Sequence, residues 1–300
     1  MQIPLLTKKE AKKAINAQNI GPNKVNGLCG SKKSTAFLGH IQTKLSFDLG
    51  KTTHFAEVKE KCLVFGNYKI LLSNLEKLKE DTIYAVVENK LLSVELFSQE
   101  TNLYYKLWPT TDWPTIMLSS VPMHRFKTST PKASAGLMVR ELFPIEGVML
   151  DTCAGLGYTS ILLANEAGCK KVIVFEKDKN VLEIAKYNPF SEELFTNKKI
   201  ELKNESVFDG IKKIPNQSIA GILHDPPTTS FAPELYSQDF YEQLYRVLKP
   251  GALLFHYCPN PGKTKGKEFW HTIIKKLKKT GFVNIEYKEK SSGITAQKKK

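Results

Sequence analysis

The chain has 300 residues, which is enough for one large α/β domain together with a smaller one. Hydrophobic residues make up 41% and charged residues 25%, a composition that is typical of a globular protein and excludes a disordered chain. No apolar stretch is long enough to span a bilayer, and no secretory signal is expected. The five cysteines show no C-x-x-C spacing, which argues against a disulfide framework or a cysteine-rich metal site and favours a reducing, cytoplasmic location.

The net charge of +14 is concentrated at the two ends of the chain. Residues 1–33 hold seven lysines and one glutamate, and residues 263–300 hold twelve lysines and three glutamates, so the middle is close to neutral. Basic ends attract polyanions through counterion release, which makes RNA a predicted partner of the Lys-rich termini. The alternative is a solvated surface that only keeps the protein in solution.

The first part of the chain predicts two segments. Residues 1–36 are rich in lysine, asparagine and glycine with weak periodicity, which predicts a basic N-terminal extension without a core of its own. Residues 37–125 change to short runs of alternating apolar and polar residues, which predict a small β-rich accessory domain. The runs are Leu45–Leu49, His54–Val58, Cys62–Phe65, Tyr68–Leu71, Thr82–Val87, Leu91–Phe97 and Leu103–Leu107.

Residues 126–292 repeat a rhythm of strand, loop and helix. Such alternation forces parallel strands through right-handed crossovers, so we predict an α/β fold with a doubly wound, mostly parallel seven-stranded sheet. Residues 293–300 are assigned to a basic tail, although residues 293–297 also fit a strand that closes the sheet. The other expected strands are Val148–Asp151, Lys171–Glu176, Ile200–Lys203, Ile219–Asp225, Ala252–Tyr257 and Phe282–Tyr287.

The strongest local signal is the loop after the strand at residues 148–151. The strand ends in Asp151, and a D-x-C-x-G-x-G pattern with Cys153, Gly155 and Gly157 leads into a helix. Small residues let the backbone approach a ligand, and the helix N-terminus carries the positive end of the helix dipole. The spacing differs from the dinucleotide fingerprint G-x-G-x-x-G, so a smaller zwitterionic ligand is favoured over a pyrophosphate. A plain tight turn is the alternative.

Two more acidic residues follow strands of the same predicted sheet. Glu176 comes directly after a strand, where a carboxylate can accept both hydroxyls of a ribose, with Asp178 as the competing acceptor. Asp225 begins an Asp-Pro-Pro segment at the same edge, where it can bind or orient a substrate N–H. The alternatives are helix capping by Glu176 and a plain strand-ending turn at Asp225.

Together the three motifs resemble those of the class I S-adenosylmethionine-dependent methyltransferases. More closely, the stretch from Leu45 to Lys290 is similar to an uncharacterised, mostly archaeal group of predicted methyltransferases. The segments that carry this likeness are residues 123–127, 151–158, 175–178, 224–227, 255–257 and 260–263. The resemblance implies a Rossmann-like fold and S-adenosyl-L-methionine as the cofactor.

The resemblance also implies roles for individual residues. The implied cofactor-binding residues are Asp151, Cys153, Gly155 and Gly157 at the amino-acid end, Glu176 at the ribose and Ser206 at the adenine, with Glu205 or Asp209 as substitutes for Ser206. The implied catalytic residues are Asp225, Pro226 and Pro227, which orient the acceptor. Arg125 is a candidate for binding a substrate carboxylate or phosphate, and Phe231 for stacking on a substrate ring, because Thr228 stands where amino-directed methyltransferases carry an aromatic residue.

We therefore predict a methyltransferase that uses S-adenosyl-L-methionine and modifies a nitrogen of RNA. One alternative is an aminopropyltransferase on the same fold, which would need more acidic residues for a polyamine than Asp225 alone. The others are a protein or small-molecule methyltransferase and a non-enzymatic RNA-binding module. No cluster of His, Cys and acidic residues has metal-binding spacing, and the sequence leaves the oligomeric state open.

Overall fold

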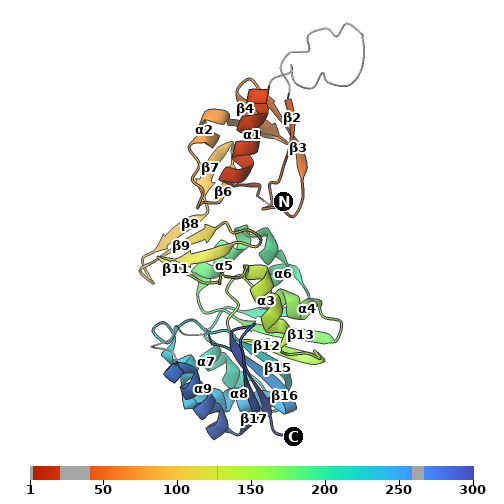
Figure 1. The fold of residues 1–300 in the computed structure, drawn as a ribbon, viewed down its shortest axis with the longest axis vertical. Coiled ribbons are helices and arrows are strands. Elements are labelled where there is room, and N and C mark those ends of the chain that lie inside the picture. Colours follow the sequence, from red (N-terminus) through yellow and green to blue (C-terminus); the bar gives the residue numbers. More distant parts are fainter. Residues whose placement is uncertain (1–2, 21–40, 127, 259–266) are drawn as a thin grey trace. The chain divides into compact units, whose positions relative to one another are not determined.

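The computed structural model describes residues 3–20, 41–126, 128–258 and 267–300, which form two compact units (Figure 1). The N-terminal unit comprises residues 1–122 with residues 187–189, and the C-terminal unit comprises residues 123–186 and 190–300. The division falls close to the predicted boundary at residue 125. The segment 260–263, which contributed to the family resemblance, lies outside the described residues, as does Lys127.

The N-terminal unit consists mainly of short antiparallel strands. Its β-rich character follows from the alternation of buried and exposed side chains along these strands. One sheet has the order β2 (Ile41–Leu45), β3 (His54–Lys59), β4 (Cys62–Phe65) and β5 (Tyr68–Leu71), and a second has the order β1 (Leu5–Leu6), β6 (Tyr84–Val87) and β7 (Lys90–Ser93). A third has the order β11 (Val121–Pro122), β10 (Thr115–Leu118), β9 (Leu103–Trp108) and β8 (Glu95–Ser98), and the helices are α1 (Lys8–Ile20) and α2 (Leu72–Glu76).

The start of the chain differs from the predicted basic extension over residues 1–36. Strand β1 pairs with β6, and helix α1 buries Ala11 and Ala14 completely in the core of the N-terminal unit. The Glu10 carboxylate accepts the backbone N–H of Ser46 at 2.9 Å. Two alanines three positions apart give α1 a narrow apolar stripe among its lysines. The composition of the segment therefore did not predict this helix. Residues 21–36 of the predicted extension lie outside the described part of the chain.

The C-terminal unit is an α/β fold around a seven-stranded sheet, as predicted, but the sheet is mixed. Every neighbouring pair is parallel except the two pairs made by β18, which runs antiparallel to both neighbours. The order is β14 (Ile200–Lys203), β13 (Cys169–Phe175), β12 (Gly147–Asp151), β15 (Ile219–His224), β16 (Leu248–Tyr257), β18 (Gly293–Lys298) and β17 (Phe282–Lys288).

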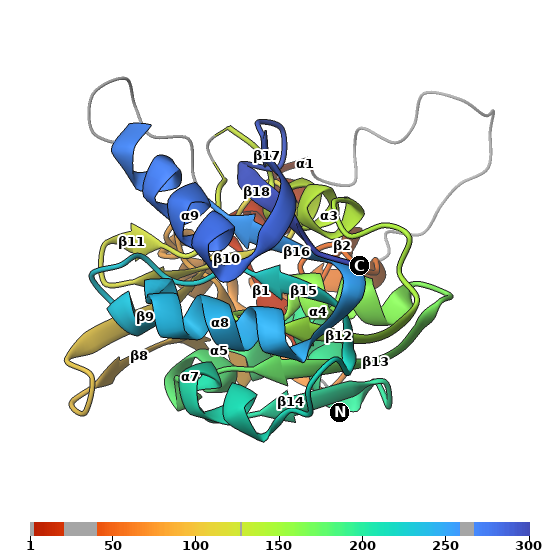
Figure 2. The ribbon, with the colours of Figure 1, turned by 90° about the horizontal axis from the view of Figure 1, so that it is seen from below.

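Helices cover both faces of this sheet (Figure 2). On one face, α3 (Pro131–Arg140) and α4 (Tyr158–Asn165) pack with α5 (Lys179–Tyr187) and α6 (Glu192–Thr196). On the other face lie α7 (Val207–Gly210), α8 (Gln238–Val247) and α9 (Lys267–Thr280). Because strands of such a sheet are buried from both sides, their sequences read as near-continuous apolar runs.

The end of the chain is part of the sheet and not the basic tail that we assigned to residues 293–300. Ile294 and Ala296 of β18 are completely buried between β16 and β17. Lys298 is only 7% exposed, and its ammonium group donates to the carbonyl oxygens of Tyr245 at 2.7 Å and Leu248 at 2.8 Å. Because these carbonyl oxygens accept its N–H groups, the ammonium group of Lys298 can be buried. The presence of a lysine at this position therefore does not indicate an exposed tail.

Candidate functional site at the carboxyl edge of the sheet

The three predicted motifs meet at one edge of the sheet. Asp151 is the last residue of β12, Glu176 follows β13, and Asp225 follows β15. Strand β12 lies between the other two, with Asp151 in register with Val174 and Leu223. Because the carboxyl ends of parallel strands share an edge, the three carboxylates come from adjacent positions. The structure thus brings together residues that are 74 positions apart in sequence.

The carboxylate of Asp151 is used for hydrogen bonds within the protein. Its side chain is fully buried, and one carboxylate oxygen accepts the hydroxyls of Thr159 and Ser160 at 2.6 Å each. The other oxygen accepts the backbone N–H of Cys153 at 3.4 Å. Burial raises the pKa of Asp151 to about 6, although these hydrogen bonds favour the charged form. Asp151 therefore fixes the loop to the first turn of α4, and its predicted contact with the cofactor stays a prediction.

The Glu176 carboxylate is held by two backbone hydrogen bonds and keeps free lone pairs. Its two oxygens accept the backbone N–H groups of Gly155 at 2.8 Å and Asp178 at 2.9 Å, and the side chain remains partly exposed. Each carboxylate oxygen has a second lone pair, so both can still accept a hydroxyl. Burial raises the pKa of Glu176 to about 7, and the charges of Asp178 and Asp151 raise it further against the two backbone hydrogen bonds.

The glycine loop is shaped by packing within the protein. Gly155 and Gly157 have φ values of +53° and +80°, which side chains rarely adopt. A Cβ on Gly155 would lie 2.7 Å from the sulfur of Met123, and one on Gly157 would lie 2.8 Å from Leu194. The N–H of Gly155 is taken by Glu176, and that of Gly157 donates to Ala154 at 2.7 Å. Both N–H groups are thus already used, and the predicted backbone contact with the cofactor stays a prediction.

Among the described residues, Asp225 accepts no hydrogen bond, in contrast to Asp151 and Glu176. The side chain of Asp225 is partly exposed. Burial raises the pKa of Asp225 to about 7, with a further contribution from the charge of Asp151. The Asp-Pro-Pro segment is fixed by Tyr236, whose hydroxyl donates to the carbonyl oxygen of Pro227 at 2.9 Å. Pro226 is buried and Pro227 is exposed.

Phe231 and Ser206 are both accessible in the structure, and their predicted binding roles stay predictions. Phe231 is 52% exposed in the turn after the Asp-Pro-Pro segment, whereas Phe240 is fully buried and stacks on Phe208. Ser206 is partly exposed directly before α7, at the carboxyl side of β14. Its proposed substitutes form ion pairs with lysines, Glu205 with Lys213 at 2.6 Å and Asp209 with Lys212 at 2.9 Å. Ser206 is therefore the better of the three candidates for an adenine contact.

The Cys153 thiol and two histidines at this edge are uncharged, and the predicted cofactor contact of Cys153 stays a prediction. Burial raises the pKa of the Cys153 thiol well above its usual range, so the thiol stays protonated. His224 and His256 are completely buried, and burial lowers the pKa of both. His224 bonds to Thr152 at 2.8 Å and to the carbonyl oxygen of Leu235 at 3.2 Å, which connects the loop after β12 to the segment before α8. Neutral, satisfied histidines of this kind position backbone and do not transfer protons to a ligand.

Two tyrosines near Asp225 were not predicted from the sequence as site residues. Tyr257 ends β16 beside Asp225, whose charge adds to the effect of burial and raises the pKa of Tyr257 to about 12. Tyr236 lies close enough for Asp225 to act on its pKa in the same direction. Tyrosines at strand ends look like core residues in sequence, and only the position of Tyr257 at the end of a strand could have pointed to the site.

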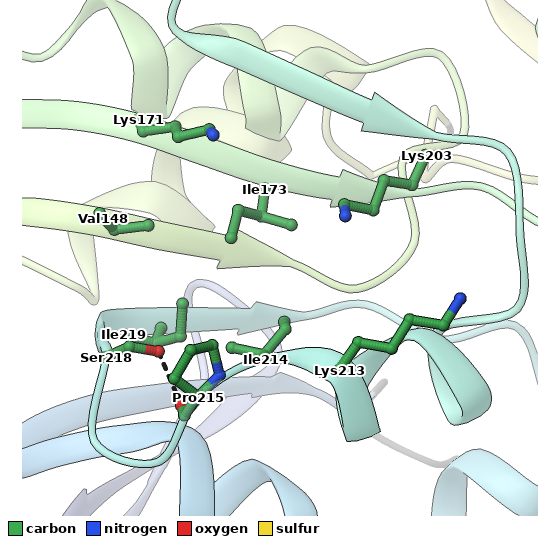
Figure 3. Close-up of a pocket in the computed structure, with 9 residues that line it drawn as sticks. All are labelled: Val148, Lys171, Ile173, Lys203, Lys213, Ile214, Pro215, Ser218 and Ile219. Atoms are coloured by element: carbon green, nitrogen blue, oxygen red, sulfur yellow. Dashed lines mark hydrogen bonds between the residues drawn. The ribbon is translucent and has the colours of Figure 1, made fainter.

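A separate cavity lies elsewhere on the sheet (Figure 3). It is lined mainly by residues near the amino-terminal ends of strands, such as Val148 and Ile219, and by three lysines. Lys171 and Lys203 both pair with Glu201, and Lys213 pairs with Glu205. None of the predicted site residues lines it, and each of its lysines already pairs with a glutamate. In the described part of the chain, no group of three or more His, Cys, Asp or Glu side chains is placed to hold a metal ion, and no helix there is long and apolar enough to cross a bilayer.

Comparison with known proteins places this fold. The C-terminal sheet with its acidic edge is Rossmann-like, and two spermidine synthase structures have the same fold. One, solved with the transition-state analogue AdoDATO, superposes with a TM-score of 0.56 at 16% identity over 72% of this chain and 75% of its own. The other, from Thermotoga maritima, gives 0.54 at 15% identity over 89% of this chain and 82% of its own.

Sequence relatives place the chain in a family. It is 38% identical over 266 residues to the uncharacterized protein MJ1233 of Methanocaldococcus jannaschii, across 85% of this chain and 88% of that protein. The chain therefore belongs to the same family as MJ1233. It is also 25% identical over 141 residues to polyamine aminopropyltransferase 2 of Streptomyces coelicolor, across 45% of this chain and 25% of that protein. No family model matches the sequence.

Proposed function

We propose that the chain is an S-adenosyl-L-methionine-dependent methyltransferase that acts on an amine nitrogen. The observation that carries this proposal is the pair formed by Glu176, which retains lone pairs for ribose hydroxyls, and Asp225, which has no hydrogen-bond partner among the described residues. The two carboxylates flank Asp151 at the edge where Rossmann-like folds bind nucleosides. The fold shared with spermidine synthases supports a nucleoside cofactor of this kind.

The residues present fit such a cofactor. A partly exposed, fixed carboxylate at Glu176 suits the two ribose hydroxyls, and the partly exposed hydroxyl of Ser206 lies beyond the neighbouring strand for the adenine. Acidic groups whose pKa values are raised by burial are stabilised in their charged forms when a cation binds nearby. A sulfonium ion supplies that positive charge, so cofactor and site are electrostatically complementary.

Asp225 would orient the acceptor and take its proton. When bound, the cofactor supplies a methyl group that is already activated by the sulfonium. The acceptor nitrogen needs a free lone pair to take this methyl group, and an amine is protonated near neutral pH. Asp225, with a pKa of about 7, would accept a proton from the bound ammonium group and hold the freed nitrogen toward the methyl group. Positioning and exclusion of water supply most of the rate.

A second candidate is aminopropyl transfer from the decarboxylated form of the cofactor. The partial likeness to polyamine aminopropyltransferase 2 and the acidic edge both favour it. Against it, Asp151 is used internally and Glu176 would be occupied by the ribose in either reaction, which leaves Asp225 as the carboxylate without a partner among the described residues to bind a polyamine. Methyl transfer therefore remains the better supported of the two reactions.

RNA as the acceptor remains a proposal that rests on charge. Many of the basic residues belong to the folded helices α1 and α9, and so present their charge on fixed surfaces. If RNA binds there, its affinity should fall steeply with salt, with a log–log slope that reports the number of phosphates contacted. Binding that is insensitive to salt would exclude this partner.

The deciding experiment compares the two cofactor forms and several acceptor pools. Calorimetry with S-adenosyl-L-methionine and its decarboxylated form tests the cofactor, and tighter binding of the decarboxylated form would favour aminopropyl transfer. Protein incubated with methyl-labelled cofactor is then offered separate RNA, protein and small-amine fractions. We expect label to enter one fraction and to be lost in Asp225→Asn. Absence of binding to either cofactor form would overturn the proposal.

A further inference from the structure

The edge of the sheet continues beyond Asp225 toward a second charged group. Asp225 follows β15, Tyr257 ends the neighbouring β16, and Ser292 directly precedes β18, whose Gly293 is in register with Tyr257. Adjacent strands lie about 4.8 Å apart, so Asp225 and Ser292 are separated by two strand spacings, about 10 Å. Tyr257 lies between them.

Arg125 stands at the far end of this row. Its guanidinium donates to the hydroxyls of Ser292 and of Thr128, the latter at 3.1 Å, and the side chain is partly buried. It makes no ion pair with any carboxylate in the described part of the chain. A guanidinium has five N–H donors in a planar fork, and two hydroxyl contacts leave enough of them to bind an anion through two oxygens. Arg125 is thus anchored and still able to bind.

A second polar group lies near Arg125. The hydroxyl oxygen of Tyr287, on β17, is buried and has no hydrogen-bond partner among the described residues. Burial raises the pKa of Tyr287, and the positive charge of Arg125 acts in the opposite direction, so the two side chains lie near each other. A buried hydroxyl without a partner is costly and rare in native proteins. An anion bound by Arg125 could accept this hydroxyl as well.

The two charges act on the same region. Tyr257 experiences both, since the negative charge of Asp225 adds to burial in raising its pKa whereas Arg125 lowers it. The site therefore has a negative end at Asp225 and a positive end at Arg125, and neither is neutralised by another described side chain. An acceptor with two amines would place one of them beside Arg125, where like charges repel.

We propose that the acceptor is a small zwitterion whose amine binds Asp225 and whose carboxylate or phosphate binds Arg125 and Tyr287. The inference rests on the proposed methyl transfer and names its substrate class. The strand order places Asp225 and the Arg125–Ser292 pair on either side of Tyr257, so a small molecule that carries both an amine and an anion is complementary to the two ends of the row. Amino acids and short amino-alkyl phosphates carry both groups.

The test must separate this assignment from a simpler one, in which Arg125 binds the carboxylate of the cofactor. Full-length protein is saturated with S-adenosyl-L-homocysteine, and binding of three zwitterions is measured: glycine, β-alanine and phosphoethanolamine. Ethylamine and 1,3-diaminopropane are the matched cations without an anionic group. Glycine and β-alanine test a carboxylate as the anionic group, and phosphoethanolamine tests a phosphate. Transfer of label to each compound is measured in parallel.

We expect at least one zwitterion to bind and accept label, and the two cations to do so at least tenfold less well. Arg125→Gln should raise the KM for that zwitterion about tenfold or more, with partial rescue in Arg125→Lys, because a charged bidentate contact is lost. The Kd for S-adenosyl-L-methionine should change less than twofold. Tyr287→Phe should raise the same KM by a smaller factor, and Arg140→Gln, on the exposed end of α3, is the matched control.

Three outcomes overturn the assignment. If Arg125→Gln weakens S-adenosyl-L-methionine as much as the zwitterion, Arg125 serves the cofactor. If the cations or RNA accept label and the zwitterions do not, the substrate class is wrong. If no zwitterion binds the saturated protein, the inference fails while the proposed function stands. Failure of every cofactor form to bind would instead remove the proposed function itself.

Discussion

The backbone N–H of Gly155 donates to the carboxylate of Glu176 over 2.8 Å, which ties the loop after β12 to the end of β13. The two motifs are therefore one structural unit, because the conformation of the glycine loop and the orientation of the acid depend on the same hydrogen bond. Any change at Glu176 acts on the loop as well as on the ligand that Glu176 would bind.

Replacing Glu176 tests the ribose contact. In Glu176→Gln the side chain keeps its shape but loses the acceptor strength of a carboxylate and introduces an N–H₂ group opposite the N–H of Gly155 or Asp178. We expect the Kd for S-adenosyl-L-methionine, measured by calorimetry, to rise roughly tenfold or more. Glu183→Gln on α5, which removes an exposed pair with Lys186, is the control and should leave the Kd unchanged. An equal Kd in both variants would contradict the assignment.

Cofactor binding should depend on pH through the same residue. Ribose hydroxyls donate to a carboxylate, so binding favours the ionised form of Glu176, whose pKa in the free protein is raised to about 7. Below that value binding must remove a proton, and the Kd should rise by up to about tenfold for each pH unit. Measured between pH 6 and 8, the affinity should therefore increase with pH.

The control for the pH profile uses a second ligand and a second variant. S-adenosyl-L-homocysteine lacks the sulfonium charge, which reduces the contribution of Asp225 and isolates that of Glu176. In Glu176→Gln the slope for this ligand should flatten. A slope that persists in the variant would assign the titration to another group, such as Asp151, whose pKa is about 6.

Asp225→Asn should separate activity from stability. We expect transfer to fall at least about a hundredfold because the proton acceptor is lost, whereas the Kd for S-adenosyl-L-homocysteine, which lacks the sulfonium charge, changes less than about threefold. The pKa of Asp225 is raised from 3.8 to about 7, so the folded state binds more protons than the unfolded state between these values. Stability contributed by this group therefore falls as pH rises across that range.

The variant should remove that loss of stability. At pH 8 its Tm should exceed that of the wild-type protein by about 2–5 °C, and at pH 4 the difference should vanish. Calorimetry or circular dichroism measures both values. A variant that is less stable than the wild type at pH 8 would mean that Asp225 has a structural partner.

Gly157→Ala should destabilise the fold. The residue has a φ of +80°, and an added Cβ would lie 2.8–3.0 Å from three carbon atoms of Leu194. We expect a loss of about 2–4 kcal/mol in the free energy of unfolding. Gly136→Ala is the matched control, because Gly136 lies inside α3 with no atom within 4 Å of a new Cβ. That variant should be more stable by up to about 1 kcal/mol. Denaturant titration of both variants measures the free energy of unfolding, and a Gly157→Ala variant as stable as the wild type would contradict the prediction.

Removing residues 293–300 should unfold the C-terminal unit. The deletion takes away β18 from between β16 and β17 and with it the contacts of Lys298 to two backbone carbonyls. Deleting only residues 299–300 leaves the strand intact and should change the Tm by less than about 2 °C. If the longer deletion retained a cooperative transition at an unchanged temperature, the position of β18 in the sheet would be wrong.

Much of the C-terminal unit could be predicted because its signals are local. Apolar runs of four to seven residues, each followed by a turn or an acid, indicate buried parallel strands, and Asp151, Glu176 and Asp225 each end such a run or follow it directly. The assignment of residues 293–300 to a basic tail was wrong, because a strand that carries buried Lys298 has the composition of a solvated tail. Helix α1 was also missed, because the apolar stripe of this lysine-rich helix consists of alanines.

The amino-acid sequence by itself determined which residues stand at the carboxyl ends of strands and therefore which acids could share an edge. Only the tertiary structure decided their roles, because a role depends on which partners have already taken each donor and acceptor. Asp151 is occupied by two hydroxyls, Glu176 is held by two N–H groups with lone pairs to spare, and Asp225 has no partner among the described residues. Arg125 faces the same edge through Ser292, which lies 167 positions away in the chain.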